Sequence, residues 1–140
     1  MRALSISWTL ALLLTSGAVP RGGYLVIVNP DNPRTSVDRQ FLEDAFLKKV
    51  THWPEDGEIQ PVDLAPSLPT RRLFSEDVLE RSVEEVRTYW DQRIFSGRDV
   101  PPPQLDDDQQ VVAYVASHPG AVGYVSSGTD LKQAKIVDVR

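Results

Sequence analysis

The sequence predicts an α/β domain in which a mostly parallel sheet is flanked by helices. Two short, continuous apolar runs, at Tyr24–Val28 and at residues 121–125, have the composition of strands buried on both faces. Between them, apolar residues recur at helical spacing in several segments. The chain also begins with a strand, a helix and a strand, an order that favours a parallel pair joined by a right-handed crossover.

The first strand ends at Asn29-Pro30, a loop signal. Ser36 is a good N-cap, so we expect a helix over residues 37–49. Its apolar face would carry Phe41, Leu42, Ala45, Phe46 and Val50. Turn residues 53–57 then precede a second strand predicted at residues 59–64.

Residues 66–70 form a polar loop that leads into a helix beginning near Arg71 and Arg72. Ser82 and Glu85 have the spacing of a capping box, which predicts that a separate helix starts there and ends before Gly97. Residues 101–103 are three prolines and predict a stiff, extended connector. The acidic residues 106–108 precede the next helix and would stabilise its positive end.

The stretch from His118 to residue 125 joins a helix stop to a buried strand. Pro119 and Gly120 end the helix. Gly123 has no side chain, which indicates either tight packing of a helix on the sheet or close approach of a ligand or another backbone. A last strand is predicted at residues 135–139.

The expected core combines residues from these apolar runs and helix faces. It contains Val26, Val28, Phe46, Val62, Phe74, Trp90, Val115, Val122 and Tyr124.

The first 18 residues resemble a signal peptide. Arg2 supplies a basic start, residues 3–14 are apolar, and small residues 16–18 suit cleavage after Ala18. We expect residues 19–140 to form a single domain that is periplasmic or secreted, without stable membrane insertion after cleavage. An uncleaved anchor is the alternative, although the apolar stretch is short for a bilayer.

Composition excludes several classes of function. The net charge is −5 at pH 7, which argues against general binding to nucleic acid. Without cysteine there can be no disulfide and no thiolate nucleophile or metal ligand. Three successive aspartates do not converge on one metal ion, and both histidines lie in turn-like contexts. We therefore expect no metal, no cofactor and no enzymatic activity.

Several segments, taken in order, resemble the phosphate-binding proteins of bacterial ABC transporters, within the type II periplasmic binding-protein-like superfamily. They are Tyr24 to Pro30, the Phe41 to Leu47 helix, Trp53 before Gly57, Ile59 to Val62, Ser67 to Phe74 and Pro119 to Val125. The resemblance implies a single lobe that holds phosphate with loops and helix N-termini at strand ends. Ser67 maps onto the serine of the family's Ser-Gly-Thr segment, whereas Leu68-Pro69 replaces the Gly-Thr pair.

Two functional hypotheses follow. The first is an exported solute-binding protein for phosphate or a related oxyanion, working with an ABC transporter; its candidate ligand-binding residues are Ser36, Ser67, Thr70, Arg71 and Arg72. For the serines the alternative is ordinary helix capping, and for the arginines a solvated helix face. The second hypothesis is a single-lobe interaction module without a small ligand, whose partner is a membrane transport or sensory component.

Overall fold

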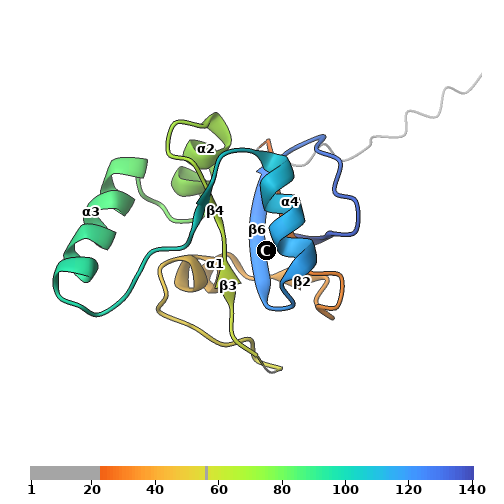
Figure 1. The fold of residues 1–140 in the computed structure, drawn as a ribbon, viewed down its shortest axis with the longest axis horizontal. Coiled ribbons are helices and arrows are strands. Elements are labelled where there is room, and N and C mark those ends of the chain that lie inside the picture. The colour runs from red at the N-terminus through yellow and green to blue at the C-terminus, as the bar shows by residue number, and fades with distance from the viewer. Residues whose placement is uncertain (1–22, 56) are drawn as a thin grey trace, which may run out of the picture.

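The computed structural model describes residues 23–55 and 57–140 (Figure 1). The predicted signal peptide lies outside these residues. The described part contains a five-stranded sheet in the order β2-β7-β1-β6-β3, a two-stranded sheet of β4 and β5, and helices α1 to α4. None of the described helices combines the length and the apolar character that crossing a membrane requires.

Strand β1 (Tyr24–Val28) lies at the centre of the main sheet. It pairs antiparallel with β6 (Ala121–Ser126) on one side and with β7 (Lys135–Val139) on the other. Val26 faces Tyr124 and Val137 in this register. Helix α4 (Asp108–Ser117) packs on one face of β6, as Figure 1 shows. These strands match the predicted runs, and the α/β class is confirmed.

The sheet is mixed rather than mostly parallel. Strand β2 (Ser36–Val37) is parallel to β7, and β3 (Gln60–Pro61) is parallel to β6, but both partners of β1 are antiparallel to it. The expected parallel pair of the first two long strands is therefore wrong. The segment after β1 adds β2 to the far edge of the sheet, and the C-terminal strands take the places on either side of β1.

The second predicted strand, residues 59–64, is divided between the two sheets. Residues 60–61 form β3, and Asp63–Leu64 form β4, which pairs in parallel with β5 (Gln104–Leu105). Val62 lies between the two strands and is fully buried. The chain thus changes sheets at Val62, and the residues after it lead toward the start of α2.

Helix α1 (Arg39–Phe46) is shorter than predicted. Its N-cap is Asp38, whose side chain makes no capping hydrogen bond. The prediction that Ser36 caps this helix is wrong, because Ser36 belongs to β2 and pairs with Asp138 of β7. The helix ends before Lys48, which has a positive φ of 54°.

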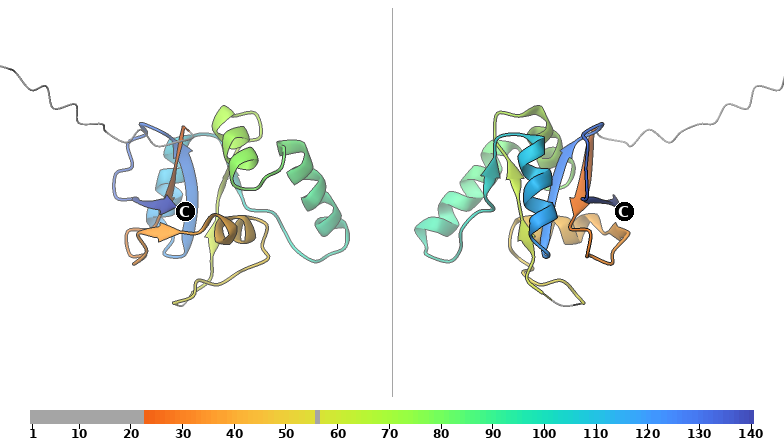
Figure 2. Two further views of the ribbon diagram at one scale, coloured as in Figure 1. Left: turned by 180° about the vertical axis from the view of Figure 1, so that it is seen from behind. Right: turned by 45° about the vertical axis from the view of Figure 1, so that its right-hand side comes forward.

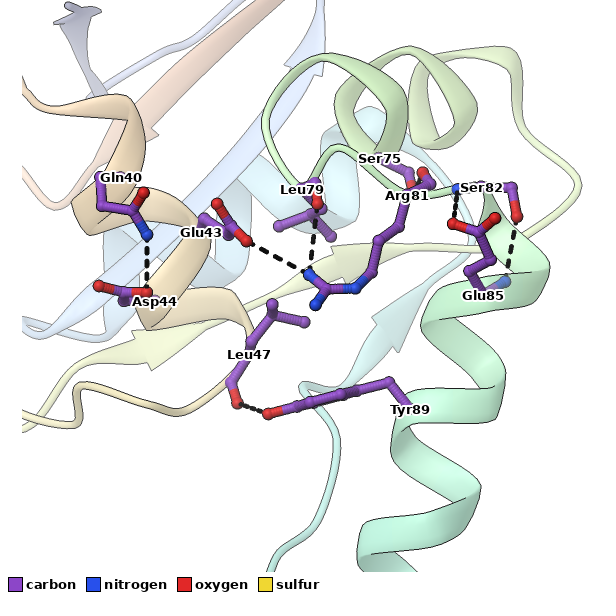
Figure 3. A network of polar contacts seen from close by, with 10 residues as sticks. All are labelled: Gln40, Glu43, Asp44, Leu47, Ser75, Leu79, Arg81, Ser82, Glu85 and Tyr89. Carbon is purple, nitrogen blue, oxygen red and sulfur yellow. Dashed lines mark hydrogen bonds and ion pairs between the residues drawn. The ribbon is translucent and has the colours of Figure 1, made fainter.

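Helices α2 (Pro69–Asp77) and α3 (Val83–Phe95) follow, and the predicted capping box of α3 is confirmed. The Ser82 hydroxyl accepts from the N–H of Glu85, and the Glu85 carboxylate accepts from the N–H of Ser82 (Figure 3). Arg81, just before α3, reaches Glu43 of α1 at 3.3 Å, and the hydroxyl of Tyr89 donates to the carbonyl of Leu47. These contacts attach one side of α3 to the end of α1.

The core lies between the main sheet and helices α1, α2 and α4, and α3 adds Val86 and Trp90 to it. All nine residues predicted for it are buried. At its centre the rings of Phe74 and Tyr124 stack with centroids 3.8 Å apart, and Phe46 packs against both. The residues that begin α2 are therefore attached to a rigid part of the molecule.

Gly123 allows α4 to lie close to the sheet. A Cβ at this position would lie 2.8 Å from Val62 Cγ1, 2.9 Å from Val111 Cγ1 and 3.3 Å from Val115 Cγ2. Of the two interpretations of Gly123, the structure supports tight packing of a helix on the sheet.

Candidate functional site

The start of α2 is the place where the predicted ligand-binding residues gather. Leu68 is the N-cap, no side chain caps the helix, and Pro69 occupies the first turn. The first N–H groups of a helix have no intrahelical acceptor, so those of Thr70 and Arg71 remain available as donors. Because the helix dipole is positive at this end, the position favours an anion.

A hydroxyl cluster, made of Thr70, Ser126 and Thr129, lies next to this helix start. Thr70 Oγ1 is 2.7 Å from Ser126 Oγ, which joins α2 to the C-terminal end of β6. Asp108, in the first turn of α4, accepts hydrogen bonds from the N–H of Ser126 at 3.3 Å and from Thr129 Oγ1 at 3.1 Å. The starts of α2 and α4 therefore meet the end of β6 here. The Asp108 carboxylate already accepts hydrogen bonds from two of the donors, the Ser126 N–H and the Thr129 hydroxyl.

The side chain of Arg71 turns into the protein. Its Nη1 lies 3.2 Å from Asp63 Oδ2 and donates to the Leu64 carbonyl at 2.7 Å. Asp63 also accepts a hydrogen bond from the hydroxyl of Tyr124. Burial raises the pKa of the Asp63 carboxyl, while the charge of Arg71 and the Tyr124 hydrogen bond oppose that rise. Burial and the Asp63 charge raise the pKa of Tyr124. This network connects β4, α2 and β6 and fixes the start of α2.

The other predicted residues have different positions. Ser67 and Arg72 are exposed beside the helix start, and no ion pair holds the Arg72 guanidinium in the described part of the chain. Ser36 lies on β2, separated from β6 by β7 and β1. The structure thus brings Ser67, Thr70, Arg71 and Arg72 together on one helix start, and it places Ser36 elsewhere.

Sequence reasoning places the anion against the loop after Val125, but it does not name Ser126, Thr129 or Asp108 as site residues. Ser126 and Thr129 belong to a hydroxyl-rich loop that follows the predicted strand at residues 121–125, and strand ends are common positions for ligand-binding groups. The sequence favours a helix-dipole role for Asp108 and argues against a metal-ligand role. The starts of α2 and α4 both lie at the end of β6. This proximity depends on the tertiary fold and has no signal in the sequence.

The site offers N–H and hydroxyl donors and one carboxylate, which is chemistry for recognising a polar group, and the exposed Arg72 lies two residues beyond Thr70 on α2. The two histidines lie away from it. His118 precedes β6, whose other end carries Ser126, and stacks on Tyr114; His52 contacts Thr51. Among residues 23–55 and 57–140, no group of three or more His, Asp or Glu side chains is arranged to hold a metal ion.

Comparison with protein families agrees with this fold. A family model described as PBP superfamily domain matches residues 18–140. The chain belongs to this family. The resemblance seen in the sequence is confirmed at this level. No curated protein matches the chain.

Solved structures with the same fold include an ABC-type phosphate transport receptor from Vibrio cholerae, with 21% identity and a TM-score of 0.65. A protein from Clostridium perfringens, assigned as a phosphate ABC transporter substrate-binding protein and solved with bound phosphate, has 23% identity and a TM-score of 0.66. PstS from Borrelia burgdorferi has 13% identity and a TM-score of 0.65. Each alignment covers 84% of this chain but only 46%, 44% and 47% of those chains, respectively. The chain therefore spans less than half the length of these structures.

Proposed function

We propose that the protein is a solute-binding protein that holds phosphate or a related oxyanion at the start of α2. The observation that carries this proposal is the uncapped start of α2 beside the Thr70–Ser126 hydroxyl pair. Backbone N–H groups at a helix start and neighbouring hydroxyls are suitable donors for an oxyanion. Three solved proteins with this fold, a phosphate transport receptor, a protein with bound phosphate and PstS, support the same ligand class.

In this proposal the ligand contacts are the hydroxyls of Ser67 and Thr70, the N–H groups of Thr70 and Arg71, and the guanidinium of Arg72. Arg71 contributes through its backbone, since its side chain is paired with Asp63. Ser36 has no part in this group of contacts, because β7 and β1 separate it from β6. Ser67 and Arg72 are exposed, so one side of the anion would contact water and binding would be weak and sensitive to salt.

We also propose that the protein is exported to the periplasm or secreted after cleavage at Ala18, and that it serves an ABC transporter without being an enzyme. The basic start, apolar stretch and small residues of positions 1–18 support export. Mass spectrometry of the exported protein measures this directly. Retention of residues 3–14 in that protein would contradict cleavage.

Calorimetric titration with phosphate and with sulfate tests the binding site. We expect weak binding that decreases as ionic strength rises, and a further decrease in Thr70→Val and in Arg72→Ala. Lys49→Ala is the matched control, because it removes one exposed positive charge just beyond the end of α1. Equal losses in Lys49→Ala and Arg72→Ala would show only a general charge effect and would contradict a site at α2.

An interaction module without a small ligand is the second candidate. The observation that favours it is the Asp108 carboxylate. This carboxylate accepts hydrogen bonds from the Ser126 N–H and the Thr129 hydroxyl, and it places a negative charge beside the proposed anion. Absence of phosphate and sulfate binding at every concentration tested would leave this second function as the better one.

A further inference from the structure

The C-terminal end of α3 and the loop that follows it carry exposed apolar side chains. Phe95 is 94% exposed, Val100 64% and Ile94 51%. The other large apolar residues with high exposure in the described part, Leu73 and Ile136, lie singly on α2 and β7. Ile94 and Phe95 are neighbours at the end of α3. Exposed apolar groups that lie together mark surfaces that contact another molecule.

Only one side of α3 is attached to the rest of the protein. Tyr89 and Arg81 make the contacts to α1 that Figure 3 shows, and α3 stands at the edge of the molecule in Figures 1 and 2. Glu84, Arg87, Asp91 and Phe95 are exposed at intervals of three and four residues, so they form one stripe along the helix. We call this the outer stripe of α3.

A cavity of about 280 Å³ borders the outer stripe. Val83, Val86, Trp90 and Ile94 of α3 line one part of it, and Pro66, Arg71, Pro101 and Gln104 complete the lining. Glu84, Arg87 and Asp91 also line it. The cavity has room for an aromatic side chain and both apolar and charged residues line it, so α3 carries an exposed aromatic group and borders a cavity that can receive one.

The positions of these groups are self-complementary. If a second α3 lies antiparallel to the first, with a twofold axis at the level of Tyr89, Phe95 of each copy comes opposite Val83 of the other. The same axis brings Arg87 of each copy opposite Asp91 of the other. Such reciprocal contacts are those of an isologous interface.

The charges of α3 fit the same arrangement. Arg87 and Asp91 lie on the outer stripe, so an antiparallel partner places a basic side chain against an acidic one on each side of the axis. Arg93 takes no part in this, because it lies over the Tyr89 ring on the attached side of α3. Within one copy Arg87 Nε is 3.9 Å from Asp91 Oδ2, and these side chains are 73% and 68% exposed, so both remain available to a partner.

We propose that the protein forms a symmetric dimer with a second copy of this chain, in which the α3 helices pack antiparallel and Phe95 enters the cavity beside Val83 of the partner. Analytical ultracentrifugation of the full 140-residue chain tests this. We expect a reversible dimer, and we expect Phe95→Asp to raise its dissociation constant at least tenfold. Ile136→Asp is the matched control, since it places the same charge at an exposed apolar position on β7. Circular dichroism verifies that both variants fold.

Charge exchange provides a second measurement. Arg87→Asp alone and Asp91→Arg alone each place like charges across the axis and should weaken the dimer. The double variant Arg87→Asp/Asp91→Arg restores opposite charges and should restore dimerisation. A chain that stays monomeric at all concentrations, a dimer unaffected by Phe95→Asp, or a double variant no better than the single ones would overturn the proposal.

Discussion

Arg71 Nη1 lies 3.2 Å from Asp63 Oδ2 in the protein interior, where their side chains are only 3% and 6% exposed. The next residue, Arg72, is exposed beside the proposed anion site. Two adjacent arginines therefore have different roles. Arg71 joins α2 to β4, and Arg72 is the exposed guanidinium that we propose as a ligand contact.

The first prediction concerns this difference. Arg71→Ala should lower the free energy of unfolding by about 3 to 5 kcal/mol, because it leaves the Asp63 carboxylate buried without its positive partner. Arg72→Ala should change it by about 0.5 kcal/mol or less, since the residue is on the surface. Urea denaturation measures both values.

An apolar replacement of the whole pair provides the control. The variant Asp63→Leu/Arg71→Met removes both buried charges, so it should be more stable than Arg71→Ala. If Arg71→Ala unfolds at the same urea concentration as the wild type, the pair does not stabilise the fold as proposed.

The second prediction concerns the close approach of α4 to β6. Gly123→Ala should destabilise the protein by about 1 to 3 kcal/mol, because the new methyl group overlaps Val62 and Val111. In a Val62→Ala background the same change should cost less, since space has been opened on one side. A double-mutant cycle from thermal unfolding gives the coupling. An equal cost in both backgrounds would contradict the packing explanation.

The third prediction compares two phenylalanines. Phe46 is buried against Phe74 and Tyr124, so Phe46→Ala should cost about 3 to 5 kcal/mol. Phe95→Ala removes the same atoms from a position that is exposed in the single chain. Measured at a concentration where the chain is monomeric, it should leave the unfolding free energy nearly unchanged. A similar loss in both variants would mean that Phe46 is not a core residue.

The fourth prediction is a pH dependence at Asp77. Its carboxylate accepts a hydrogen bond from Tyr24 and pairs with Arg39 Nη1 at 2.8 Å. Partial burial raises the pKa of Asp77, but the Tyr24 and Arg39 interactions outweigh burial and hold the pKa below its usual value. The folded state therefore binds this proton less tightly than the unfolded state. The stabilisation is present above the ordinary Asp pKa and is lost as pH falls through the folded value.

Thermal unfolding between pH of about 6 and about 3 checks this sign. The wild type should be more stable than Asp77→Asn at the upper end, and the difference should shrink as pH falls. Glu76→Gln is the control, because this exposed neighbour makes no side-chain hydrogen bond or ion pair in the described part of the chain. A constant difference across the range would show that the Asp77 carboxylate is not the titrating group.

The sequence was sufficient where local signals decide the structure. The apolar run at Tyr24–Val28 and the Ser82–Glu85 capping box appear in the structure as predicted. Their signals depend on periodicity and on a hydrogen-bonding pattern within a few residues. Strand pairing depends on contacts between distant segments, and for this reason the antiparallel partners of β1 could not be read from the order of elements.

The same distinction holds for the candidate site. Thr70 and Arg72 could be proposed because hydroxyls and arginines before a helix are recognisable in the sequence. The sequence also pointed to the loop after Val125, but it could not single out Ser126 and Asp108, because their proximity to Thr70 results from the end of β6 meeting two helix starts. The sequence predicts Ser36 as a helix cap, but Ser36 lies on the edge strand β2, whose backbone pairs with β7.

The last prediction uses Asp108 to locate the anion. This carboxylate accepts a hydrogen bond from the N–H of Ser126, whose hydroxyl contacts Thr70, so it lies near the proposed ligand at the start of α2. Asp108→Asn removes its negative charge and retains an oxygen that can accept a hydrogen bond. The repulsion of one charge at such a partly exposed site is about 1 kcal/mol, so phosphate should bind roughly fivefold more tightly.

Asp106→Asn is the matched control, because it removes an exposed charge two residues away without a contact to Ser126. Calorimetry at fixed ionic strength measures both variants. Unchanged or weaker binding in Asp108→Asn would place the anion away from the start of α2, whereas a gain confined to this variant would identify Asp108 as the group that limits affinity.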